Sequence, residues 1–128
     1  MFWKPSWWKK WFGDRSEGAA VQFFRQRGCR ILKRNYSCKH GELDIVALDE
    51  EGLIFVEVRS TSQGDPYLTA ESIDWAKEHK LTLTAHHFIQ RYQLHEYCGR
   101  FDVLIIQWPP GQNRPKFTHY PNAFEATE

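Results

Sequence analysis

Residues 41–59 read GELDIVALDEEGLIFVEVR, and this stretch decides the fold. Two runs rich in Val, Ile and Leu, residues 41–48 and 53–59, flank the short polar segment 49–52, which ends in glycine. Such runs on either side of a short polar segment predict two strands joined by a tight turn. Strands joined in this way pair antiparallel, so the stretch predicts a β-hairpin.

The turn sets the register of this hairpin. A two-residue turn and a four-residue loop give the same register, which places three pairs of residues opposite one another: Val46 and Phe55, Asp44 and Glu57, and Glu42 and Arg59. Successive side chains on a strand point to opposite faces of the sheet. One face is therefore predicted to carry Leu43, Ile45 and Ala47. The other face is predicted to carry Asp44 and Glu57 side by side.

Asp44 and Glu57 form the most informative of these pairs. Directly opposed residues have Cβ atoms roughly 4.5–5.5 Å apart, so two carboxylates there repel each other. They must share a proton, meet a cation or reach bulk water. A Mg²⁺ or Mn²⁺ ion would neutralise the two carboxylates, because hard cations prefer oxygen ligands. Such an ion can also polarise a phosphoryl oxygen. A salt network in which Arg59 neutralises Glu42 or Glu57 explains the same spacing equally well.

The remaining sequence predicts one α/β domain built around the hairpin. Two further helices and three further strands are expected: residues 14–26 and 69–91 as helices, and residues 29–36, 101–108 and 115–120 as strands. Ser16, or its rival Asp14, is the expected N-cap of the first helix. Up to residue 108, the order α-β-β-β-α-β indicates a mixed sheet flanked by helices. Residues 14–128 are then the domain, and residues 1–13 a tail.

Size and composition are those of a single globular domain. The chain has 128 residues, of which 41% are hydrophobic and 26% charged. No run approaches the roughly 18 apolar residues of a membrane span, and no continuous apolar segment at the N-terminus resembles a signal peptide. We therefore expect a cytoplasmic protein without an integral membrane segment. Cys29, Cys38 and Cys98 show no paired spacing and are expected to be reduced, and Cys38 with His40 lacks a second ligand pair for zinc.

Charge is unevenly distributed, although the net value is only +1. Residues 18–41 contain no acid and carry six basic side chains: Arg25, Arg27, Arg30, Lys33, Arg34 and Lys39. A basic run next to Asp44 suits a polyanion held beside a metal ion. A solvated face that balances acids elsewhere is the alternative.

The tail, residues 1–13, holds four of the six tryptophans: Trp3, Trp7, Trp8 and Trp11. In a helix, Trp7 and Trp11 share one face. Three interpretations stand: an anchor at a membrane interface, a surface on which bases stack, or a segment that packs on its own domain or on a neighbouring subunit.

Five short motifs follow one another in the chain: GELDIV at residues 41–46, FVEVR at 55–59, KEHKL at 77–81, RFDV at 100–103 and NAF at 122–124. In this order they resemble the YraN family of bacterial endonuclease-like proteins. That family resembles Holliday-junction resolvases and belongs to the restriction-endonuclease-like, PD-(D/E)xK superfamily. The resemblance covers residues 16–124 and implies a restriction-endonuclease-like fold.

The resemblance also implies roles for individual residues. Asp44 and Glu57 match the metal-binding carboxylates of the motif, and Glu17 matches a glutamate that such nucleases bring from the first helix. Arg59 stands where the superfamily usually has lysine. Arginine stays charged and is a poor general base, but it can stabilise charge that develops on a phosphate.

The residue pattern and the resemblance together lead to three hypotheses about function. In the first, the protein is a Mg²⁺- or Mn²⁺-dependent endonuclease that acts on DNA, with branched or single-stranded structures as candidate substrates. The six basic side chains would position the DNA backbone, and Lys77 or Lys80 would replace the missing lysine. In the second, Arg59 marks a nucleic-acid-binding module without turnover. In the third, residues 1–13 dock the protein into an assembly. Resolvase-like relatives often dimerise, so a homodimer is expected by analogy.

Overall fold

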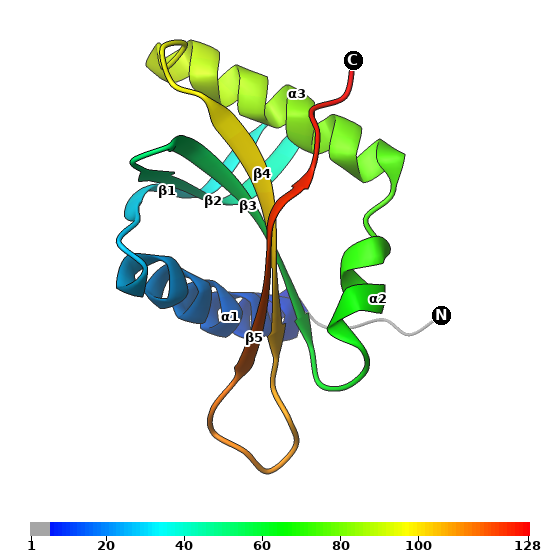
Figure 1. Cartoon of the computed structure of the whole chain (residues 1–128). Helices are drawn as coiled ribbons and strands as arrows, with labels where there is room; N and C mark the ends of the chain where they lie inside the picture. Colours follow the sequence, from blue (N-terminus) through cyan, green and yellow to red (C-terminus); the bar gives the residue numbers. More distant parts are fainter. Residues whose placement is uncertain (1–5) are drawn as a thin grey trace.

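The computed structural model describes the backbone of residues 6–128 and the side chains from Arg15 onward. Figure 1 shows the arrangement of the elements. In chain order they are α1 (Ser6–Gln26), β1 (Arg30–Cys38), β2 (Gly41–Asp49), β3 (Gly52–Thr61), α2 (Pro66–Glu71), α3 (Trp75–Tyr92), β4 (Gly99–Gln107) and β5 (Lys116–Phe124).

The strands form one mixed sheet in the order β1-β2-β3-β4-β5. β1, β2 and β3 are antiparallel neighbours, β3 and β4 are parallel, and β5 is antiparallel to β4. Parallel neighbours need a crossover connection, which α2 and α3 provide. Figure 1 shows α1 on one face of the sheet, with α2 and α3 on the other. This is the predicted α/β mixed sheet flanked by helices, and it is consistent with a restriction-endonuclease-like fold.

The core lies in layers on both faces of the sheet. On one face, Phe24 of α1 packs in a cluster with Ile54 of β3. On the other face, Phe88 of α3 packs in a cluster with Phe55 of β3. Ile54 and Phe55 are consecutive yet belong to different layers, as the two-residue period of a strand requires. The hairpin is therefore buried from both sides.

α1 begins earlier than the sequence predicts, at Ser6 rather than near residue 14. Ser16 and Asp14 therefore lie inside the helix, and neither is its N-cap. The prediction was wrong because serine and aspartate cap a helix only where its first turn leaves amides unpaired. Ser16 is instead buried, and its hydroxyl oxygen accepts hydrogen bonds from the Ser60 hydroxyl and, at 2.9 Å, from Trp108 Nε1.

The helix predicted over residues 69–91 is divided into α2 and α3, which residues 72–74 separate. Asp74 has an extended backbone and accepts a hydrogen bond from the Lys77 amide at 2.9 Å, so it caps α3. Asp65 caps α2 in the same way, ahead of a proline in the first turn. Two N-caps mark two helix starts, and the apolar pattern that runs through both concealed the break. β5 likewise extends beyond its predicted end, to Phe124.

The predicted tail falls largely outside the described part of the molecule. Residues 1–5 are not described, and neither are the side chains of residues 6–14, so the predictions for Trp3, Trp7, Trp8 and Trp11 lie outside the described residues. The division into residues 1–13 and 14–128 stays a prediction, as does the cytoplasmic location. From Ser6 onward, no helix is both long and apolar enough to span a bilayer.

Candidate active site

The regular alternation of side chains breaks at Asn35, in the middle of β1. Asn35 has a φ of +52°, in the left-handed region that asparagine tolerates better than most residues. Beyond this point Tyr36 pairs with Leu43 and both face α3, whereas Ile45 faces α1. The prediction that Leu43 shares a face with Ile45 and Ala47 is therefore wrong, because the alternation of β2 also breaks, at Asp44, which lies across from Asn35.

Asp44 lies where β2 and β3 separate. The predicted register holds as far as Ile45 opposite Val56, and the next step would bring Asp44 opposite Glu57, but the ladder ends before that step. Asp44 Oδ2 instead accepts a hydrogen bond from the Val58 amide at 2.8 Å. The carboxylate thus satisfies a backbone donor at the opening between the two strands.

Glu57 is the second carboxylate of the site, and it is only 7% exposed. Its carboxylate oxygens lie 3.4 Å from Arg59 Nε and 3.6 Å from Lys77 Nζ. Of the two partners considered for Arg59, Glu42 and Glu57, the ion pair in the described part of the chain is with Glu57. Of the two lysines considered as replacements for the motif lysine, Lys77 reaches this carboxylate, whereas Lys80 is exposed on α3.

Arg59 Nε is buried and, among the described residues, has no hydrogen-bond partner. Its 3.4 Å distance to Glu57 is an ion-pair contact without hydrogen-bond geometry. A buried donor left unsatisfied costs about 1–3 kcal/mol. Such donors are rare in folded proteins, and a bound ion, water or ligand is a common explanation for them.

Glu17 brings a third carboxylate from α1. It is 8% exposed and accepts a hydrogen bond from Arg34 Nε at 2.7 Å. Glu17 and Asp44 line the same small cavity of about 130 Å³ between α1 and the sheet, together with Ser16 and Asn35. The structure thus brings Glu17 close to Asp44, with its charge already paired with Arg34.

Burial and the repulsion of neighbouring acids raise the pKa values of both central carboxyl groups. Burial raises the pKa of Glu57 to about 7, repulsion from Asp44 adds to this, and Lys77 and Arg59 oppose it. Burial also raises the pKa of Asp44, with smaller contributions from the charges of Glu17 and Glu42, against the hydrogen bond from the Val58 amide and the charge of Lys77. Lys77 therefore acts on both carboxylates. Neighbouring acids with raised pKa values are typical of functional sites.

The donor set fits a hydrated divalent cation. Among the described residues, no three His, Cys, Asp or Glu side chains converge to enclose a metal ion. Mg²⁺, however, keeps several waters and is usually held by one or two carboxylates together with substrate phosphates. Asp44 and Glu57 suffice for this, and a cation would relieve the repulsion that helps to raise the pKa of Glu57. Glu17 would join them only after release from Arg34.

The sequence model of the family described as "Uncharacterised protein family UPF0102" matches residues 16–106. The chain belongs to the UPF0102 family. This is the YraN-like family that the five motifs predict. The part of the chain that matches UPF0102 contains every residue of the site: Glu17, Asp44, Glu57, Arg59 and Lys77.

UPF0102 proteins from several bacteria are similar to this chain over most of its length. The protein of Pelotomaculum thermopropionicum is 35% identical over 116 residues, which cover 91% of this chain and 97% of the relative. The protein of Pseudomonas syringae pv. tomato is 40% identical over 100 residues, which cover 77% of this chain and 78% of the relative. The protein of Pelobacter propionicus is 42% identical over 118 residues, which cover 88% of this chain and 81% of the relative.

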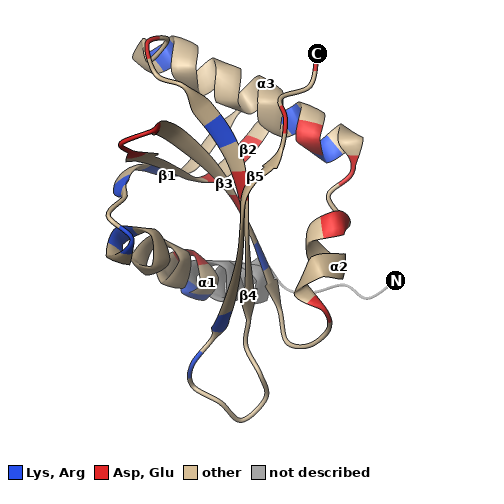
Figure 2. Cartoon of the chain, in the orientation of Figure 1, with Lys and Arg blue, Asp and Glu red and all other residues tan. Residues whose placement is uncertain are grey.

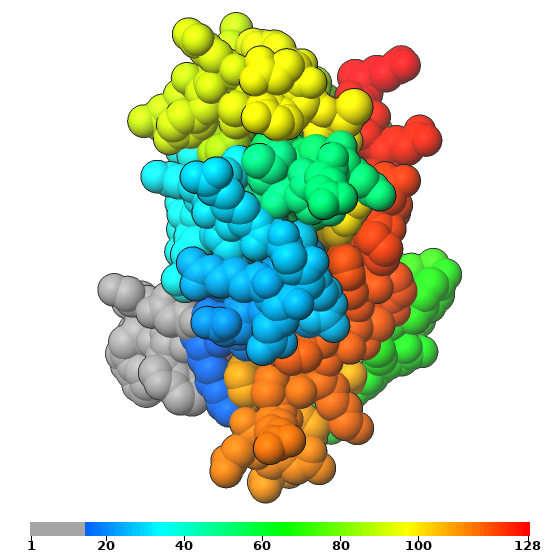
Figure 3. Space-filling view, turned by 60° about the vertical axis from the view of Figure 1, so that its left-hand side comes forward, coloured from blue at the N-terminus to red at the C-terminus, as the bar shows by residue number. Residues whose placement is uncertain are grey.

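The six basic side chains of this UPF0102 protein lie on α1, on β1 and in the turn that follows each of them. Figure 2 shows basic residues at the C-terminal end of α1 and on β1, and Figure 3 shows the segment that joins these elements on the surface. Arg34 reaches the site through Glu17. Arg27 folds over the ring of Phe23, 3.4 Å from its centre. The other four are exposed: Arg25, Arg30, Lys33 and Lys39.

Asp102, a further buried carboxylate, belongs to a separate network. It accepts hydrogen bonds from Arg100 Nε at 2.9 Å, His119 Nε2 at 2.7 Å and the Asn122 amide at 2.9 Å. Burial tends to raise the pKa of Asp102, but the bonds from His119 and Arg100 outweigh it and lower the pKa. The sequence left open whether this aspartate orients an arginine, orients a base or caps the strand. In the structure it holds Arg100 and ties β4 to β5.

Proposed function

We propose that the protein is a metal-dependent endonuclease that hydrolyses phosphodiester bonds of DNA. The observation that carries the proposal is the pair Asp44 and Glu57, two carboxylates that repel each other where β2 and β3 separate. Arg59 and Lys77 approach Glu57 with positive charge. Acids beside cations suit the joint binding of a divalent ion and a phosphodiester, because the ion takes the carboxylates and the phosphate takes the cationic donors.

Asp44 and Glu57 would hold Mg²⁺ or Mn²⁺, with water and a phosphate oxygen as further ligands. Such an ion, when bound, polarises the phosphoryl oxygen and makes hydroxide available near neutral pH. Glu57 must lose its proton to act as a ligand, so metal affinity should rise with pH up to about its pKa of 7. Glu17 would become a third ligand once Arg34 turns to the DNA.

Arg59 and Lys77 would together take the place of the single lysine found in related motifs. Arg59 Nε, which lacks a hydrogen-bond partner among the described residues, is available to donate to a phosphate oxygen. Arginine keeps its proton, so Arg59 is not the base. Lys77 approaches the same carboxylate from α3 and would stabilise the negative charge that develops on the phosphate.

Nicking of a supercoiled plasmid and of a labelled four-way junction tests the proposal, with Mg²⁺, Mn²⁺ or EDTA in parallel. We expect cleavage only with metal, and its loss in Asp44→Asn and in Glu57→Gln. Glu50→Gln is the matched control, because Glu50 is an exposed acid in the turn between β2 and β3 and should be dispensable. Cleavage that persists in EDTA, or that survives Glu57→Gln, would overturn the proposal.

The exposed basic side chains of α1, of β1 and of the turns that follow them would position the DNA backbone without reading its sequence. Affinity should then fall steeply with salt, because each phosphate contact releases counterions. Lys33→Gln should weaken binding to all sequences alike and reduce the salt slope by about 1. Affinity that is independent of ionic strength would remove this role.

One observation favours a second function, a nucleic-acid-binding module that keeps the fold without turnover. Glu17 is already paired with Arg34, and Glu57 with two cations. A site neutralised in this way needs no metal. Asp44→Ala would then leave DNA binding unchanged or tighter, and neither metal would support cleavage by the wild-type protein.

A further inference from the structure

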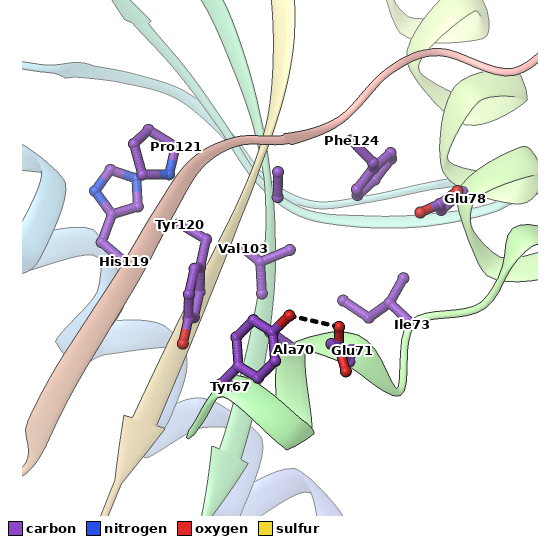
Figure 4. A pocket seen from close by; sticks show the side chains of 11 residues that line it. Tyr67, Ala70, Glu71, Ile73, Glu78, Val103, His119, Tyr120, Pro121 and Phe124 are labelled. Carbon is purple, nitrogen blue, oxygen red and sulfur yellow. Dashed lines mark hydrogen bonds between the residues drawn. The ribbon is translucent and has the colours of Figure 1, made fainter. Parts of the chain in front are cut away.

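A cavity of about 710 Å³ opens on the α2 and α3 face of the sheet, beside the proposed active site. Figure 4 shows it between α2, the start of α3 and the last strand. This volume is within the roughly 300–1,000 Å³ of typical ligand pockets. Its walls include Tyr67 of α2, Glu78 of α3, Val103 of β4, and Tyr120 and Phe124 of β5.

Two tyrosine rings line this cavity, one from α2 and one from β5. Tyr67 is 54% exposed, and its hydroxyl donates a hydrogen bond to Glu71 Oε1 at 2.7 Å, which holds the ring in place. Tyr120 projects from β5 toward the same space (Figure 4). In the described part of the chain, neither ring stacks on another aromatic ring. Their faces are therefore available to a flat ligand, and base stacking on aromatic side chains is a common mode of binding unpaired nucleic acid.

The charges around the cavity are acidic. Glu71 and Glu78 line it, and no lysine or arginine does. Its one histidine, His119, is hydrogen-bonded to Asp102 at 2.7 Å. Figure 4 shows the Glu78 carboxylate directed toward Phe124, and among the described residues this carboxylate has no hydrogen-bond or ion-pair partner. A phosphate is therefore a poor occupant. A flat ligand with amine donors suits the cavity, because a carboxylate accepts hydrogen bonds from groups such as the cytosine N4 amine.

The cavity adjoins the proposed active site along the sheet. Glu57 on β3 is in register with Val103 on β4, which lines the cavity, and neighbouring strands lie about 4.8 Å apart. On α3, Lys77 faces Glu57, and the next residue, Glu78, faces the cavity. A phosphate beside Lys77 would thus have the cavity as its neighbour.

We infer that this cavity binds an unpaired nucleobase of the strand whose phosphate lies at Glu57 and Lys77. The inference rests on the proposed function and specifies its substrate as nucleic acid with unpaired nucleotides rather than continuous duplex. The base lies between the rings of Tyr67 and Tyr120, and Glu78 accepts a hydrogen bond from its exocyclic amine. Adenine and cytosine carry such an amine and thymine does not, so the cavity discriminates against thymine.

Fluorescence anisotropy with labelled oligodeoxyadenylate, oligodeoxycytidylate and oligothymidylate tests this inference on the full chain, in EDTA so that no cleavage occurs. We expect the adenine and cytosine strands to bind more tightly than the thymine strand. Tyr67→Ala should weaken their binding fivefold or more, the equivalent of about 1 kcal/mol or more for a lost stacked base. Tyr97→Ala is the matched control, because Tyr97 is also exposed but does not line the cavity.

Glu78→Gln should remove the preference over thymine while leaving some stacking affinity. Tyr67 makes its side-chain hydrogen bond within α2, so its replacement leaves the sheet intact and a loss of binding reports on the cavity. Tyr67→Ala with unchanged affinity, equal binding of the thymine strand, or no binding of any single strand would overturn the inference.

The two proposals can fail separately. Metal-dependent plasmid nicking together with unchanged binding by Tyr67→Ala would leave the nuclease and remove the base cavity. Weakened binding by Tyr67→Ala together with no nicking in either metal would support the cavity and remove the nuclease.

Discussion

Replacement of Glu57 by glutamine should stabilise the protein at neutral pH and above. The substitution preserves the shape of the side chain and removes the negative charge that burial and Asp44 make unfavourable. Functional sites often retain such unfavourable charges, and their removal then trades activity for stability. In the wild-type protein the cost of this charge depends on pH, so the effect of the substitution should depend on pH as well.

The magnitude follows from the pKa of Glu57, which is about 7 in the folded protein against an ordinary value of 4.5. Below about pH 4.5 the carboxyl group is neutral in both states and costs nothing. Between about pH 4.5 and 7 the unfolded chain has released the proton and the folded chain keeps it. The free energy of unfolding then falls by about 1.4 kcal/mol per pH unit, or about 3 kcal/mol in total.

Urea denaturation of the wild-type protein and of Glu57→Gln, in EDTA and at several values between about pH 5 and pH 8, measures this difference. We expect the variant to gain about 2–3 kcal/mol over the wild type between these limits. Glu50→Gln, the exposed control, should follow the wild-type curve. A difference between Glu57→Gln and wild type that is constant with pH, or that shrinks as pH rises, would refute the reasoning.

Lys77→Met should lower the rate of metal-dependent cleavage by roughly 10²-fold or more, whereas Lys80→Met, which removes an exposed lysine of the same helix, should have little effect. Equal single-turnover rates for the two variants would contradict the role of Lys77. Arg34→Ala and Glu17→Gln in a double-mutant cycle should show a coupling energy of about 1 kcal/mol in urea unfolding, since the arginine is half exposed. A coupling near zero would mean that the pair does not hold α1 to the site. Phe88→Ala should destabilise the fold by about 3–5 kcal/mol, because this side chain is buried between α3 and the sheet. A loss below about 1 kcal/mol in the same assay would contradict this packing.

The hairpin could be predicted from sequence because its determinants are local. The turn at residues 49–52 and the alternation of residues 53–59 set both the strands and their register. The helix boundaries were harder, because Asp74 lies within an apolar pattern that continues on both sides of it. Asp74 caps α3 only because its backbone is extended, and the sequence pattern does not indicate that conformation. Residues 69–91 were therefore predicted as one helix.

The chemistry of the site was predictable in part. The register alone brings Asp44 toward Glu57. The left-handed backbone at Asn35 was not predictable, although asparagine within a strand is the residue type that most readily permits it. The contact of Lys77 with Glu57 depends on how α3 packs across the sheet, and a strand pattern contains no information about that packing.

Titration of the protein with Mn²⁺, followed by the loss of the electron paramagnetic resonance signal of the free ion, tests the central claim most directly. If Asp44 and Glu57 form a divalent-cation site, the wild-type protein should bind one ion that Mg²⁺ displaces. Asp44→Asn and Glu57→Gln should lose this ion, and Glu50→Gln should keep it. No binding by the wild type, or equal binding by all four proteins, would contradict the account.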